Sequence, residues 1–167
     1  MFNKILVAID DSTTSRKVFA AGLSLAKKTG ASLMLLHVLS SKEKDDPSPF
    51  IYSDLKYNPN VETILEAYRE QWQKFEQQGR EFLQSLTEEA TKAGVKTEFK
   101  QTFGYPGRKI CSLAQTWSAD LILVGSRGLT GLKEMFLGSI SNYVTHHAPC
   151  SVLIVREDAD EVLSPKR

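Results

Sequence analysis

Residues 5–13, ILVAIDDST, decide how this chain folds. The five apolar residues at 5–9 run without alternation, which is typical of a strand buried on both faces of a parallel sheet. The next four residues are polar, and Ser12 or Thr13 is predicted to cap the first free N–H groups of a helix. A buried strand that passes directly into a helix predicts the start of a βαβ unit.

The same alternation of apolar runs and helical patterns continues along the chain. Further strands are predicted at 33–39, 95–102, 120–124 and 151–155. The pattern predicts an α/β protein with an open, doubly wound, five-stranded parallel sheet in the order 3-2-1-4-5 and helices on both faces. One domain is expected over residues 1–157, followed by a polar tail at 158–167.

Two segments depart from this regular pattern. Residues 40–60 are longer than an ordinary strand-to-helix connection, so we expect a flexible loop. It would be either a functional flap over the ligand edge of the sheet or a solvated, variable loop. Residues 61–93 keep a helical apolar period over roughly 50 Å, which is longer than such a domain needs. That helix should therefore overhang the domain or break near Gly79.

Composition narrows the class of protein. The 167 residues are 41% hydrophobic and 25% charged, which is ordinary for a globular fold. With 21 basic and 20 acidic residues the net charge is +1, so the basic footprint of a nucleic-acid partner is missing. No apolar run approaches the roughly 20 residues that cross a bilayer. Cys111 and Cys150 form no CxxC and are read as small buried hydrophobes. We expect a cytoplasmic protein without nucleic-acid or membrane partners.

Glycines and serines gather after the fourth predicted strand. The run Gly125-Ser126-Arg127-Gly128 follows the strand directly, and Gly138-Ser139-Ile140-Ser141 opens the next helix. Glycine lets a backbone approach a phosphate closely, and a helix start supplies free N–H groups with a partial positive charge. Ligands of doubly wound sheets bind where the strand order reverses, here between Asp10 and Gly125. The segment is therefore either an anion cradle or a glycine turn before an ordinarily capped helix.

The spacing Gly125-x2-Gly128-x9-Gly138-Ser139 resembles the nucleotide-binding signature of the universal stress protein family. Other landmarks of that family are matched in order and spacing by residues 7–12, 36–38, 104–106 and 148–153. Some members of the family bind ATP, whereas others have lost the glycine motif and bind none. Because this chain keeps the motif, the resemblance implies the ATP-binding branch.

The resemblance also implies which residues bind the nucleotide. Ala8, Ile9 and Val38 would line the adenine pocket, and Asp10 would meet the ribose hydroxyls, with helix capping as the alternative role for Asp10. The ribose and phosphates would be surrounded by Gly125, Arg127, Gly128, Gly138, Ser139, Ile140 and Ser141. Mg²⁺ or Mn²⁺ is expected to be bound through the phosphates rather than by protein ligands. Asp11, where the family often has glycine, could narrow the mouth of the site.

These features predict an ATP-binding regulatory or stress-response protein with little or no turnover and no catalytic residue. The alternative is a slow ATPase or an ATP-using enzyme on a related nucleotide-binding fold. The sequence has neither a GxxxxGK[ST] loop nor a GxGxxG, which weighs against an ordinary ATPase. The resemblance further implies a homodimer through residues 152–155, and a regulatory protein partner that the sequence does not identify.

Overall fold

The computed structural model describes residues 1–40, 60–126 and 137–156 of the chain. Its five strands form one parallel sheet in the order β3-β2-β1-β4-β5, as predicted. The elements follow one another as β1 (Lys4–Ile9), α1 (Ser15–Thr29), β2 (Ser32–Leu39), α3 (Val61–Lys92), β3 (Thr97–Phe103), α4 (Pro106–Trp117), β4 (Leu121–Gly125), α5 (Ser139–His147) and β5 (Ser151–Val155). The predicted flexible loop at 40–60 lies outside the described residues except for its two ends, as does the predicted tail at 158–167.

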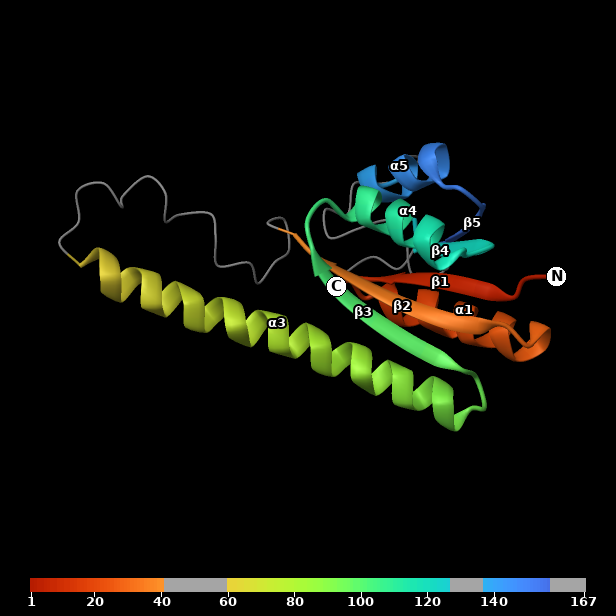
Figure 1. Ribbon diagram of the computed structural model, residues 1–167, viewed down its shortest axis with the longest axis horizontal. Helices are drawn as coiled ribbons and strands as arrows, with labels where there is room; N and C mark the ends of the chain where they lie inside the picture. The colour runs from red at the N-terminus through yellow and green to blue at the C-terminus, as the bar shows by residue number, and fades with distance from the viewer. Residues whose placement is uncertain (41–59, 127–136, 157–167) are drawn as a thin grey trace, which may run out of the picture.

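Each face of the sheet packs against its own pair of helices (Figure 1). On one face, Ile5 and Val7 of β1 pack with buried residues of α1 and α3. On the other face, Leu6 of the same strand packs with Ile110 of α4 and Val144 of α5. The alternation of side chains along a strand accounts for this division, because neighbouring residues point to opposite faces. The central strand is buried on both sides, as its unbroken apolar run predicts.

The first helix begins later than the sequence predicts, and the capping prediction for Ser12 and Thr13 is wrong. Helix α1 starts at Ser15 with Thr14 at the N-cap. The Ser12 hydroxyl instead donates to the carboxylate of Asp10. At the other end Gly30 has φ = 73° and ends the helix as a left-handed cap.

Helix α3 is the longest element and runs without a break through Gly79. At 1.5 Å a residue its 32 residues span about 48 Å. Its N-terminal half projects past the carboxyl ends of β2 and β3, which is the overhanging alternative (Figure 1). Its apolar residues are fully buried only from Phe75 onward, and Trp72 packs edge-on against Phe103 of β3 at 5.5 Å between ring centroids. None of the described helices is both long enough and apolar enough to cross a membrane.

Helix α3 approaches the sheet closely at Gly79. A Cβ added there would meet the side chain of Gln101 and would lie 2.8 Å from Nδ1 of His37. These two side chains are opposite each other on β3 and β2, and Gln101 Nε2 donates to His37 Nδ1 at 3.2 Å. The glycine therefore provides the space in which a polar pair is buried beneath a helix.

Replacing Gly79 with alanine is expected to lower the free energy of unfolding by about 1–3 kcal/mol. Overpacking against His37 and Gln101 outweighs the gain in helix propensity, which is about 1 kcal/mol. Urea denaturation followed by tryptophan fluorescence measures the change. Gln78→Ala, one residue away on the exposed side, is the matched control and should be nearly neutral. A Gly79→Ala protein as stable as Gln78→Ala would contradict the close approach.

Candidate functional site

The carboxyl ends of β1 and β4 lie side by side, where the strand order reverses. Val7 of β1 is in register with Leu123 of β4, so the residues that follow both strands meet at one edge of the sheet. Nine predicted site residues are in the described part of the chain: Ala8, Ile9, Asp10, Val38, Gly125, Gly138, Ser139, Ile140 and Ser141. The other two, Arg127 and Gly128, lie outside it.

The three residues predicted to line an adenine pocket divide between the two faces of the sheet. Val38 is buried in the cluster beneath α4 and α5, and the partly buried Ala8 packs against the same cluster. Ile9 is buried in the opposite cluster, beneath α1 and α3. Only Ala8 and Val38 therefore present side chains on the face shared with α5, whereas Ile9 can contribute its backbone alone.

Asp10 holds the turn that follows β1. Its Oδ1 accepts hydrogen bonds from the backbone N of Ser12 at 2.9 Å, from the Ser12 hydroxyl, and from the Ser15 hydroxyl at 2.7 Å. Its own backbone N donates to Oγ of Ser15 at 2.8 Å. No described residue donates to Oδ2 of Asp10. Oδ1 of Asp10 thus fixes the turn, whereas Oδ2 accepts no hydrogen bond from a described residue. Asp10 can therefore hold the turn and bind a ligand at the same time. Asp11 beside it is exposed.

A second set of hydrogen bonds closes the base of the glycine segment. The backbone N of Gly138 donates to the carbonyl of Ser126 at 2.9 Å. The Ser141 hydroxyl donates to the carbonyls of Ser126 and Gly138 at 3.3 and 3.0 Å. Ser126 is anchored in turn, because its backbone N donates to the carbonyl of Val155 at 2.9 Å. Ser141 is only 2% exposed, so its hydroxyl joins the two ends of the segment rather than facing solvent.

The first turn of α5 offers backbone donors at this edge. Gly138 is its N-cap and, having no side chain, leaves the turn without a side-chain cap. Asn142 is the first residue whose N–H bonds back into the turn, to the carbonyl of Gly138 at 2.9 Å. The N–H groups of Ser139, Ile140 and Ser141 have no acceptor among the described residues. Three such donors, with the positive end of the helix dipole, suit an anion.

Among the described residues, the remaining metal-ligating and nucleophilic side chains form no second candidate site. Among the described residues, no group of three His, Cys, Asp or Glu side chains could hold a metal ion. Burial raises the pKa of the Cys111 thiol, and burial, then Asp120 and Cys111, raise that of Cys150. Both thiols are free of disulfides, and a raised pKa makes them poorer nucleophiles and metal ligands at neutral pH.

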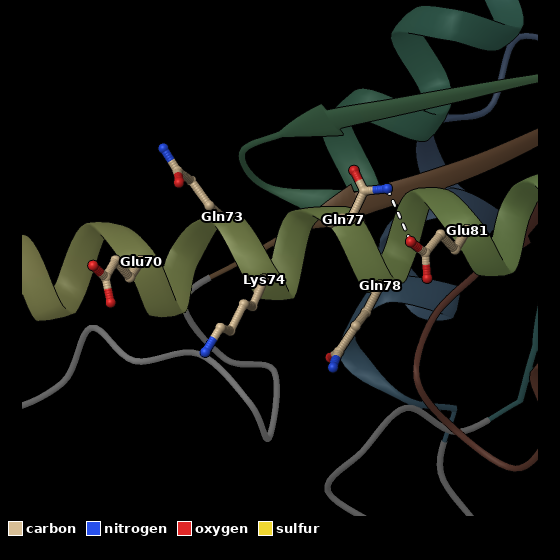
Figure 2. Close-up of a pocket in the computed structure, with 6 residues that line it drawn as sticks. All are labelled: Glu70, Gln73, Lys74, Gln77, Gln78 and Glu81. Atoms are coloured by element: carbon tan, nitrogen blue, oxygen red, sulfur yellow. Dashed lines mark hydrogen bonds between the residues drawn. The ribbon is translucent and has the colours of Figure 1, made fainter.

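A polar depression along α3 is distinct from the edge just described. Figure 2 shows its six lining residues, all projecting from this one helix: Glu70, Gln73, Lys74, Gln77, Gln78 and Glu81. Gln77 Nε2 donates to Oε1 of Glu81 at 2.9 Å. None of the nine described site residues lines it, and its lining has the character of a solvated helix face.

Sequence reasoning missed the two serines that hold the site together. Ser126 supplies the carbonyl on which the glycine segment closes, and Ser15 bonds to Asp10 from the first residue of α1. Ser126 lies inside the glycine motif, so its position was visible. Ser15 is five residues from Asp10, and nothing but the conformation of the turn brings the two together.

Comparison with known proteins gives a consistent result across sequence and structure. The sequence model of the universal stress protein family matches residues 1–156. The universal stress protein Sll1388 of Synechocystis is 37% identical over 156 residues, covering 93% of this chain and 98% of the relative. The solved structure of the hypothetical protein MJ0577 superposes with a TM-score of 0.75 at 24% identity, covering 95% of this chain and 99% of that one.

A second solved structure carries a nucleotide. A universal stress protein family member from Arabidopsis thaliana, At3g01520, was solved with AMP bound. It superposes with a TM-score of 0.63 at 23% identity, covering 97% of this chain and 96% of that chain. At this level of identity the likeness shows a shared fold.

Removing the Ser141 hydroxyl is expected to destabilise the closed glycine segment. Ser141→Ala leaves the carbonyls of Ser126 and Gly138 without this buried donor, and the free energy of unfolding should fall by about 1–2 kcal/mol. Ser139→Ala removes an exposed hydroxyl two residues earlier and should cost far less. Thermal and urea denaturation of both variants provide the measurement. Equal stability of the two variants would contradict the closing role of Ser141.

Proposed function

The chain belongs to the universal stress protein family, and from this premise we propose that it binds ATP and acts as a nucleotide-dependent regulatory or stress-response module. The observation that carries the proposal is Oδ2 of Asp10 at the switch point, to which no described residue donates, together with the first turn of α5, which has no side-chain cap. A carboxylate oxygen and a row of backbone N–H groups match the two ends of a nucleotide, the ribose hydroxyls and the phosphates.

The nucleotide would lie along the carboxyl edge of the sheet, with its base beside Ala8 and Val38 and its phosphates at the first turn of α5. Ala8 and Val38, which pack on the α5 face of the sheet, would line the base, and Asp10 would accept hydrogen bonds from the ribose. The phosphates would approach Gly138, Ser139 and the first turn of α5. The binding of AMP by a structural neighbour supports a nucleotide as the ligand.

The glycine motif supplies the remaining proposed contacts. Gly125, Arg127 and Gly128 would surround the ribose and phosphates with Ile140. A helix terminus favours an anion by only about 0.3–2 kcal/mol, which is too little for a triphosphate. We therefore assign a Mg²⁺ or Mn²⁺ ion bound through the phosphate oxygens, since the described residues offer no protein-held metal site.

Little or no turnover is proposed for this site. A P-loop lysine is missing from the sequence, and 125–128 contains no acidic residue to position a water. The module would therefore report nucleotide to a protein partner rather than consume it. Its two free cysteines fit a reducing, cytoplasmic location.

Asp10→Asn is expected to weaken binding of Mg·ATP by roughly 10- to 100-fold, the worth of a hydrogen bond to a charged group. The amide can keep the oxygen that holds the turn but replaces Oδ2 with a donor, which cannot accept from the ribose. Isothermal titration calorimetry with ATP and Mg²⁺ measures the affinity.

Asp11→Asn is the matched control, because it neutralises an exposed neighbouring carboxylate and should bind ATP as wild type does. Equal affinity of Asp10→Asn and Asp11→Asn would contradict the assigned site. Phosphate release measured on the same samples tests the alternative function. Turnover near that of ordinary ATPases would identify an enzyme instead of a binding module.

A homodimer through β5 is the second part of the proposal. The outer edge of β5 carries Leu153, which is 40% exposed, and an unpaired apolar edge strand favours association. Pairing of two copies of residues 152–155 across a two-fold axis would cover it.

Leu153→Asp should convert the dimer to monomer, because a charge would be buried at the two-fold interface. Light scattering coupled to size-exclusion chromatography at micromolar concentration gives the mass. Phe103→Asp places the same charge on the other outer strand and should leave the dimer intact. A wild-type protein with the mass of a monomer would refute the interface.

A further inference from the structure

Two large aromatic side chains stand exposed where β3 ends, and they turn to opposite faces of the sheet. Phe103 is 59% exposed and Tyr105 is 47% exposed. Phe103 meets Trp72 of α3 edge-on at 5.5 Å between ring centroids. Tyr105 instead meets Tyr143 of α5 edge-on at 5.7 Å. Only Tyr105 therefore lies on the face where Ala8 and Val38 pack.

Tyr105 also belongs to a segment that contacts both β2 and α5, the two elements that carry Val38 and the helix start. The backbone N of Gly104, the preceding residue, donates to the carbonyl of Leu39 at 3.0 Å, which fixes the turn beside the end of β2. Leu39 directly follows Val38, which would line the base. Tyr143, which the Tyr105 ring contacts, lies on α5 four residues after Ser139. The segment of Tyr105 is thus joined to the end of β2 by its backbone and to α5 by its ring.

The ring of Tyr105 rests on a rigid support. Tyr143 packs so closely on α4 that a Cβ at Gly107 would lie 2.7 Å from its Cδ1 atom. On its far side Tyr143 stacks on His147 at 4.1 Å with an interplanar angle of 12°. The backbone carbonyl of Tyr143 lies 2.8 Å from Nδ1 of His147. A ring held in this way loses little conformational freedom when a ligand packs against it.

We propose that Tyr105 is a specificity-determining residue of the nucleotide site, and that its ring stacks on the base opposite the wall formed by Ala8 and Val38. This inference rests on the proposed ATP binding and adds a chemical preference to it. Stacking tolerates any base but strengthens with the area of the ring system. Tyr105 therefore favours purine over pyrimidine nucleotides.

The test compares the affinities of wild type, Tyr105→Leu and Tyr105→Phe for Mg·ATP and Mg·UTP by calorimetry. Tyr105→Leu should weaken ATP binding by roughly tenfold, the lower range of a base–aromatic stack, and weaken UTP binding less. Tyr105→Phe keeps the ring and should bind ATP as tightly as wild type. Phe103→Leu is the matched control, because it removes another exposed ring, from the opposite face, and should leave ATP binding unchanged.

Three results would overturn the assignment while wild type still binds ATP. Tyr105→Leu could bind ATP as wild type does, Tyr105→Phe could lose as much affinity as Tyr105→Leu, or ATP and UTP could lose equally. A wild-type protein that binds no ATP would overturn the proposed function as well. Far-ultraviolet circular dichroism and thermal denaturation establish that each variant is folded, which is expected because both replaced rings are exposed.

Discussion

The parallel pairing of β1 with β2 on one side and with β4 on the other is the constraint on which the molecule depends. Ile5, Leu6 and Val7 are completely buried, and between them they anchor the cores on both faces of the sheet. Because the chain builds outward from β1 in both directions, the connections that leave the carboxyl ends of β1 and β4 lead to helices on opposite faces. Ligands of such sheets bind at this switch point, where the candidate site lies.

Two sets of hydrogen bonds hold the described residues at the carboxyl edge of the sheet. They use neither Oδ2 of Asp10 nor the first N–H groups of α5, which remain as acceptor and donors for a ligand. Asp10 uses Oδ1 for the turn into α1, and Ser141 joins Ser126 to Gly138 beneath the glycine segment. In both sets a side chain accepts or donates hydrogen bonds that hold described residues of the edge in place. Such preorganisation reduces the entropy lost on binding, which suits a module proposed to sense nucleotide.

Helix α3 gives this molecule its asymmetry. Its C-terminal half is held to the sheet through Gly79, where the polar pair His37 and Gln101 lies under the helix backbone. Its N-terminal half extends past the carboxyl edge, and Trp72 and Phe103 mark the point where it leaves the sheet (Figure 1). The helix therefore carries a long polar and aromatic surface on the opposite face of the sheet from Tyr105 and α5.

The sequence by itself determined the strands and predicted their order. Short unbroken apolar runs bounded by turn residues are typical of strands buried on both faces, and the glycine motif follows one of them directly. Of the predicted site residues, Asp10 and Gly125 follow or end neighbouring strands, the Ile9 side chain lies on the opposite face, and Arg127 and Gly128 lie outside the described residues. Local spacing was enough to place the strands, because each strand depends on residues close together in the chain.

Only the tertiary structure decided which atoms at that edge remain open to a ligand. The partner of Oδ1 of Asp10, the burial of the Ser141 hydroxyl and the unbroken course of α3 at Gly79 all depend on contacts across turns or between elements far apart. His37 and Gln101, for example, are 64 residues apart and meet because β2 and β3 pair in register. The period of the apolar pattern indicates which face of a helix or strand a residue occupies. The hydrogen bonds of its side chain depend on which other elements pack against it in the folded protein.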